Sequence, residues 1–143
     1  MHLISRVAFV FPALVLAACA IKQDVRPVVG LPSGQQVCIV DAPSVRQGFR
    51  DELVASLRRK GFQPEVKPAG SPTTVCPVTV TYLARWSWDL TIYLSYAEVN
   101  VYRDGIQGGS ARYDSTRGGA NMGKFIDAER KVNELVEQLF PAG

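Results

Sequence analysis

Hydrophobic and polar residues alternate through the middle of the chain, which is the pattern of strands with one buried face. In residues 75–88, apolar side chains occupy every second position. A second alternating segment, residues 93–105, ends on Asp104 and Gly105, a pair that tolerates the positive φ of a type I′ turn. A third segment, residues 108–116, follows this turn. The pattern predicts three antiparallel strands joined as a meander.

Two other segments repeat apolar residues at the spacing of an amphipathic helix. In residues 43–61 the repeat is every four positions: Val45, Phe49, Leu53 and Leu57. In residues 121–141 it alternates between three and four positions: Phe125, Ala128, Val132, Leu135 and Leu139. Ser44 with Gln47 predicts a capping box for the first helix, and Asn121 predicts a cap for the second.

Two short strands complete the expected domain. Residues 36–42 form an apolar, β-branched run typical of a buried strand, and Pro64 restricts a strand over residues 62–66 to an edge or terminal position. A strand, a helix and a strand in this order imply a parallel crossover. We therefore predict an α+β fold of order β-α-β-β-β-β-α, with a mostly antiparallel sheet of about four to five strands and both helices on one face.

The N-terminus has the layout of a secretory leader, with a short basic start and then an apolar run too short to span a bilayer. The run ends in residues 16–19, Leu-Ala-Ala-Cys, which resemble the lipobox of bacterial lipoproteins. The resemblance implies cleavage after Ala18, a diacylglyceryl thioether on Cys19 and acylation of the new amine, with palmitate as a typical chain. The alternative is an ordinary secretory signal with a chance cysteine.

These features divide the chain into three parts. Residues 1–18 are the expected signal peptide, and residues 19–35 comprise the lipidated cysteine and a flexible tether rich in Pro, Gly and polar residues. Residues 36–143 form a single periplasmic domain. A tether of this length would let the domain hang off the membrane without lying on it. Ala20, where an Asp would favour the inner membrane, points to the outer membrane by resemblance to other lipoproteins.

Composition narrows the function classes. The whole chain has a formal net charge of only +3, which is too small to indicate nucleic-acid binding. The single histidine, His2, lies in the leader, so the mature protein lacks the side chain best suited to proton transfer near neutral pH. We therefore expect no enzyme, no metal site and no cofactor. Cys38 and Cys76 predict a disulfide in an oxidising periplasm, and two buried free thiols are the alternative.

Residues 85–98 concentrate aromatic and acidic side chains and are the first candidate site. An interaction surface here would consist of five residues: Trp86, Trp88, Asp89, Tyr93 and Tyr96. However, the two tryptophans continue the apolar face of their strand, so packing in the core is the simpler interpretation.

A glycine-rich segment, residues 118–125, is the second candidate site. It matches the G-x-x-x-x-G-K start of a phosphate-binding loop, but Phe125 stands where Ser or Thr must hold Mg²⁺, so we reject nucleotide binding. A weaker hypothesis is an anion-binding loop made by Arg117, Gly118, Gly119 and Lys124, against an ordinary strand-to-helix connection.

The chain resembles the small bacterial Sbal-type lipoprotein family in four features: the lipobox, the early Val-Cys-Ile strand, the second cysteine and residues 87–105. That family has no assigned activity to carry over. The resemblance implies the anchor, the cysteine pair and the fold.

We therefore expect a lipoprotein held through Cys19 at the outer membrane, facing the periplasm and acting as a non-enzymatic protein-interaction or assembly module. Its expected partners are the membrane and an envelope protein, and nucleic acid is not among them. The alternative is a binding module for cell-wall glycan or anionic lipid, and a hydrolase ranks third.

Overall fold

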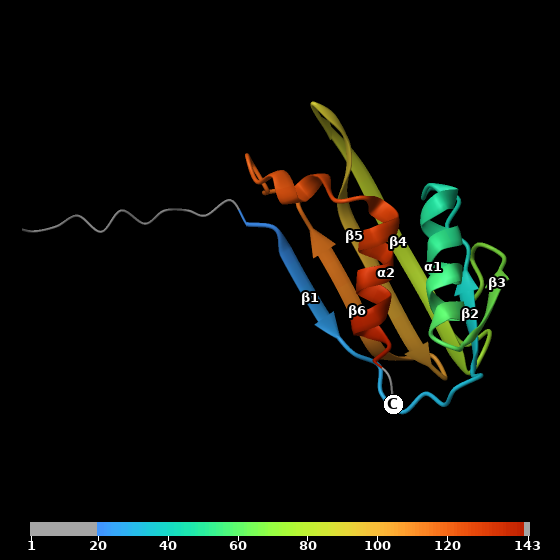
Figure 1. Cartoon of the computed structure of the whole chain (residues 1–143). Coiled ribbons are helices and arrows are strands. Elements are labelled where there is room, and N and C mark those ends of the chain that lie inside the picture. Colours follow the sequence, from blue (N-terminus) through green and yellow to red (C-terminus); the bar gives the residue numbers. More distant parts are fainter. Residues whose placement is uncertain (1–19, 142–143) are drawn as a thin grey trace, which may run out of the picture.

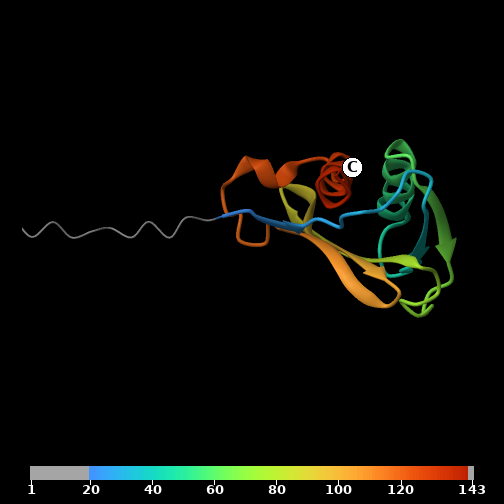
Figure 2. The same cartoon turned by 90° about the horizontal axis from the view of Figure 1, so that it is seen from below.

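The computed structural model describes residues 20–141, so the expected signal peptide and Cys19 lie outside the described residues. The described chain has the predicted α+β fold, in which a six-stranded mixed sheet is covered on one face by two helices (Figures 1 and 2). The strand order is β1-β6-β5-β4-β2-β3. The elements are β1 (Lys22–Arg26), β2 (Gln36–Val40), α1 (Gln47–Arg59), β3 (Gln63–Lys67), β4 (Val78–Asp89), β5 (Thr91–Arg103), β6 (Ile106–Asp114), the short 3₁₀ helix η1 (Met122–Phe125) and α2 (Ala128–Leu139).

The predicted meander is confirmed. β4 pairs antiparallel with β5 along nearly its whole length, and β5 pairs antiparallel with β6. Asp104 and Gly105, which connect β5 to β6, have φ values of 50° and 83°. Both values are positive, as the predicted type I′ turn requires.

The crossover from β2 through α1 to β3 is also confirmed, because β2 pairs in parallel with β3, and β3 lies at the edge of the sheet. The predicted capping box is wrong. Residues 43–45 form a turn, closed by the Val45 N–H donating to the Ala42 carbonyl, so that Arg46 becomes the N-cap and makes no side-chain cap hydrogen bond.

The strand count exceeds the prediction because residues 22–26 are not a tether. They form β1, which pairs antiparallel with β6, and Val28 just beyond is 3% exposed. The segment shows no apolar pattern because main-chain hydrogen bonds attach it to β6. The Gln23 side chain also hydrogen-bonds to Glu134 and Lys131 of α2.

The second predicted helix is divided in two. Asn121 caps the short η1 by accepting from the Gly123 N–H, and Asp127 caps α2 by accepting from the Arg130 N–H. Between them Ile126 is extended, with φ −57° and ψ 141°. Because the segment is divided, η1 contacts β5 and α2 packs over β6 and β1.

The core lies between the sheet and the two helices, and its fully buried side chains include Ile39, Leu53, Leu57, Val80, Val99, Tyr113, Leu135 and Leu139. Cys38 and Cys76 form the predicted disulfide, with their Cα atoms 6.0 Å apart. This bond connects β2 to the segment before β4, where hydrogen-bonded pairing is short: only Cys38 with Thr79 and Ile39 with Val80.

Among residues 20–141, no helix is both long enough and apolar enough to cross a membrane.

Replacing both Cys38 and Cys76 with Ala should lower the free energy of unfolding by about 4 kcal/mol, because the bond closes a 38-residue separation in the unfolded chain. Guanidinium denaturation of the variant and the parent protein measures this difference. An unchanged midpoint, or alkylation of both cysteines without a reductant, would contradict the role of the bond.

Candidate interaction surface

The β4–β5 hairpin extends beyond the rest of the sheet and exposes apolar side chains. Its neighbour β6 ends at Asp114, which lies opposite Tyr96, so residues 86–94 have no β6 partner. At the end of the hairpin Trp88, Leu90 and Ile92 are 73%, 82% and 55% exposed, and we call these three residues the apolar tip.

The core interpretation of the two tryptophans is wrong for Trp88. The alternation of β4 continues through Trp86 to Trp88, because the extra residue at the register shift, Ser95, belongs to β5. Trp88 is exposed because β6 has no residue opposite this end of the hairpin, so no core lies beneath it. Trp86 remains half-buried and meets the Phe49 ring edge-on at 6.3 Å, with the Arg46 guanidinium 4.7 Å from its own ring centre. Trp86 therefore packs against α1, whereas Trp88 faces solvent.

Lys124 of η1 is turned toward the hairpin. Its side chain is only 5% exposed, and its ammonium group forms an ion pair with Asp89 and donates to the Gly119 carbonyl oxygen at 2.5 Å. Tyr93 adds an edge-on contact with Phe125, with the ring centres 5.6 Å apart. These contacts fasten η1 to the base of the apolar tip.

The anion-loop hypothesis is consequently wrong for Lys124 and Gly118. Lys124 is occupied by Asp89, and the N–H groups that would receive an anion bond within the loop instead. Gly118 donates to the Ser115 carbonyl and Gly123 to the Asn121 side chain. Arg117 and Gly119 are exposed, and an anion contact through these two residues stays a prediction.

Tyr96 is the neighbour of the buried Ala97 on β5 and so lies on the opposite face of the sheet, which the helices leave open (Figure 2). On this face a polar network joins β5 and β6. The Tyr96 hydroxyl donates to Glu98 at 2.5 Å, Asn100 donates to the same carboxylate at 2.8 Å, and Gln107 donates to Asn100 at 2.7 Å. Arg112 forms an ion pair with Glu98 at 3.3 Å. The five predicted surface residues are thus divided among the tip, α1, η1 and the open face.

This open face is hollowed. A depression of about 660 Å³ lies over β1, β5 and β6, and its lining includes Asp24, Arg26, Glu98, Asn100, Tyr102, Gln107 and Arg112. We call this depression, together with Tyr96, the open-face hollow. The sequence pattern placed Asp24 and Arg26 in the tether and put Glu98, Asn100 and Tyr102 on the polar side of a strand, so of this surface it predicted only Tyr96 as a site residue. The presence of tyrosine and amide side chains there, instead of lysine and threonine, is the one signal that could have identified them.

The network sets the protonation of its members. Hydrogen bonds from Tyr96 and then Asn100 lower the pKa of Glu98, and the charge of Arg112 lowers it further. Burial raises the pKa of Tyr96, and the hydrogen bond to Glu98 adds to this effect. Glu98 is therefore an ionised acceptor and Tyr96 a neutral donor at neutral pH.

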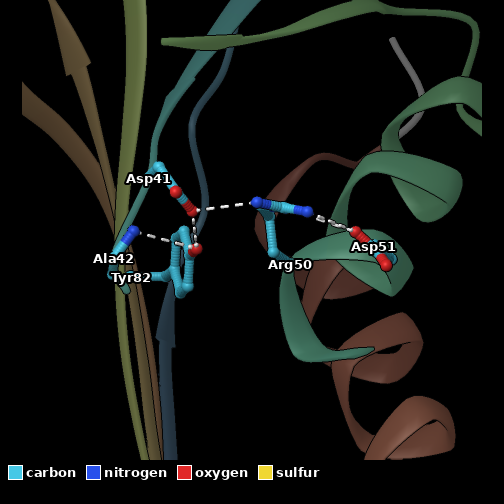
Figure 3. Close-up of polar contacts among 5 residues, drawn as sticks. All are labelled: Asp41, Ala42, Arg50, Asp51 and Tyr82. Carbon is cyan, nitrogen blue, oxygen red and sulfur yellow. Dashed lines mark hydrogen bonds and ion pairs between the residues drawn. The ribbon is translucent and has the colours of Figure 1, made fainter. Parts of the chain in front are cut away.

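A second polar cluster lies where β2 leads into α1 (Figure 3). The Tyr82 hydroxyl donates to Asp41 and accepts from the Ala42 N–H, both at 3.1 Å, and Arg50 of α1 forms an ion pair with Asp41 at 3.2 Å. Burial, the largest effect, raises the pKa of Tyr82. Because each of these groups has a partner, the cluster fixes α1 to the sheet and presents no free nucleophile or base.

Within residues 20–141, no three His, Cys, Asp or Glu side chains gather as metal ligands would.

Comparison with known proteins shows the fold alone. No family model and no curated protein matches the chain. Two solved structures of the PelC dodecamer from Paraburkholderia phytofirmans are similar to it. A point variant of PelC aligns with a TM-score of 0.60 and 12% identity, covering 84% of this chain and 97% of that one. The second PelC structure aligns with a TM-score of 0.59 and 13% identity, covering 86% of this chain and 99% of that one.

A minor lipoprotein from Acinetobacter baumannii is more distant, with a TM-score of 0.43 and 11% identity over 77% of this chain and 92% of that chain.

Replacing Tyr96 with Phe should raise the pKa of Glu98, because its strongest hydrogen-bond donor is lost. The lowered pKa makes Glu98 stabilising above its ordinary value of 4.5, and this contribution is lost as the pH falls through the folded-state value. NMR titration of the Glu98 carboxyl measures the shift. Tyr102→Phe, which leaves the Glu98 contacts intact, is the control, and equal Glu98 titration curves in both variants would contradict the network.

Proposed function

We propose that this chain is a lipid-anchored protein of the bacterial cell envelope that works as a non-enzymatic protein-interaction module. The lipobox-like residues 16–19 support the anchor, because several acyl chains on Cys19 would hold a protein stably at a bilayer. Ala20 supports placement at the outer membrane, facing the periplasm. The resemblance to the Sbal-type lipoproteins supports the lipid anchor.

The open-face hollow is the observation that carries the proposed interaction. It is a concave surface on one face of the sheet, and the two helices cover the other face (Figure 2). It combines Tyr96 and Tyr102 with Arg112, and tyrosine and arginine are enriched where proteins bind one another. Because hydrogen bonds already fix Glu98 and Asn100, a partner would lose less free energy in ordering them.

The polar groups of the described chain support a non-enzymatic role. In the clusters around Glu98 and around Asp41, the charged and hydroxyl groups bond to one another. A catalytic site needs such groups directed at a substrate.

The PelC structures support a role in assembly, since a protein with this fold forms a dodecamer. A second copy of this chain is accordingly one partner for the open-face hollow, beside a different envelope protein.

A glycan is the second candidate ligand for the same hollow. Sugars stack on aromatic rings and bond to amides and carboxylates, and Tyr102, Asn100 and Glu98 lie together there. Sedimentation with purified peptidoglycan tests this candidate. If a glycan is the ligand, the protein should sediment with the wall and Tyr102→Ala should lose most of that binding; a protein that stays in the supernatant contradicts it.

The interaction itself is tested by crosslinking in cells. A photoreactive benzoylphenylalanine in place of Tyr102 should give a defined crosslinked product, either to a second copy of the chain or to one envelope protein. The same group in place of Arg130, which is exposed on the helical side, should not give this product. Equal products from both positions, or none from Tyr102, would refute binding through the hollow.

The anchor is tested in the same cells. Cys19→Ser should move the protein from the membrane fraction to the soluble periplasm. A variant that stays with the membrane would refute lipidation at Cys19.

A further inference from the structure

We infer that the apolar tip is a second membrane contact, which inserts Trp88, Leu90 and Ile92 into the bilayer that holds the lipid anchor. The inference rests on the proposed lipidation of Cys19. It goes beyond that proposal because it assigns a ligand, the apolar interior of a lipid surface, to the hairpin, and it gives the domain an orientation on the membrane.

The first argument is the length of chain between the anchor and the fold. β1 begins at Lys22, so only Ala20 and Ile21 separate it from Cys19. From the Cα of Cys19 to the Cα of Lys22 the chain spans at most about 11 Å. A domain anchored through Cys19 therefore lies against the bilayer, and the end of the molecule where β1 begins faces it.

The second argument is what else lies at that end. Lys22 pairs with Asp114 at the end of β6, and Asp114 pairs with Tyr96, where the β4–β5 hairpin starts to project alone. A side chain at Gly123 or Gly118 would touch Ile21, so the start of the chain packs on the loop that carries η1. Lys124 and Asp89 bind this loop to the hairpin.

Figure 1 shows the result: the entry of the chain, the orange-red η1 and the β4–β5 tip lie along one edge of the molecule. A flat surface can touch all three, with the strands oblique to it. Met122 of η1, which is 71% exposed, adds a fourth apolar side chain to this edge.

The chemistry of the tip suits a bilayer better than water. Tryptophan is enriched at membrane interfaces, where its ring meets acyl chains and its N–H meets the polar headgroups. Leu90 occupies the turn with a φ of 62°, a conformation in which glycine or asparagine is usual, so the sequence keeps a large apolar residue at the most exposed position despite the backbone cost. The ion pair of Asp89 with Lys124 removes the net charge nearest to the tip.

Tryptophan fluorescence tests this directly, since the chain contains only two tryptophans. The mature lipidated protein is reconstituted in phosphatidylcholine vesicles, with and without a spin-labelled acyl chain as quencher. In Trp86→Phe the remaining Trp88 should lose most of its emission to the quencher and shift to the blue relative to its emission in detergent-free buffer. In Trp88→Phe the remaining Trp86, packed on Phe49, should be nearly unaffected.

A matched pair of variants separates insertion from mere proximity. Leu90→Ser, made in the Trp86→Phe protein, should reduce the quenching of Trp88. Ile106→Ser should not, although Ile106 is 76% exposed and comparable with Leu90 at 82%, because it begins β6 beside the β5–β6 turn, at the opposite end of the strands.

The outcomes distinguish this inference from the proposed anchor. A lipidated protein whose Trp88 is quenched by aqueous acrylamide and not by the labelled lipid overturns the tip contact and leaves the anchor intact. A protein whose intact mass shows no lipid on Cys19 overturns the anchor, and with it the orientation on which this inference depends.

Discussion

The contact between β2 and β4 holds the two halves of this protein together. On one side is the β2-α1-β3 crossover, and on the other the antiparallel strands β4, β5 and β6 with β1 at their edge. The two halves share only two paired positions in the sheet, Cys38 with Thr79 and Ile39 with Val80. The disulfide, the packing of α1 on α2 and the contact of Asp41 with Tyr82 and Arg50 supply what the short ladder lacks. The sheet depends on this joint to present one continuous open face.

The sequence pattern predicted the long strands and the first helix correctly, because the burial of one face imposes a fixed spacing of apolar residues on each. The alternation from Val78 to Ala84 follows the buried face of β4, and the four-residue repeat around Leu53 follows the buried face of α1. The pattern misleads at Trp88, because β6 ends opposite Tyr96 and the β4–β5 hairpin projects beyond it, which leaves no core beneath Trp88. Neither feature is visible in the alternation itself.

Interactions between distant residues explain the other differences. β1 is held by main-chain bonds to β6, which leave no mark on composition. The sequence predicted that Lys124 binds an anion, but its ammonium group instead pairs with Asp89, 35 residues earlier in the chain. Of the candidate sites, the exposed hairpin was predictable from the apolar residues near Asp89. The open-face hollow was not, because it arises from side chains of β1, β5 and β6 that only the folded sheet brings together.

The two edges of the sheet restrict how this protein can associate. At one edge β1 carries exposed Lys22, Asp24 and Arg26, and at the other β3 carries Pro64, whose nitrogen has no hydrogen to donate. Charged residues and proline at sheet edges discourage a further strand from joining. Another copy of the chain therefore has little opportunity to extend the sheet by adding a strand at either edge. Neighbouring molecules must meet through side chains on faces and loops, where recognition can be selective.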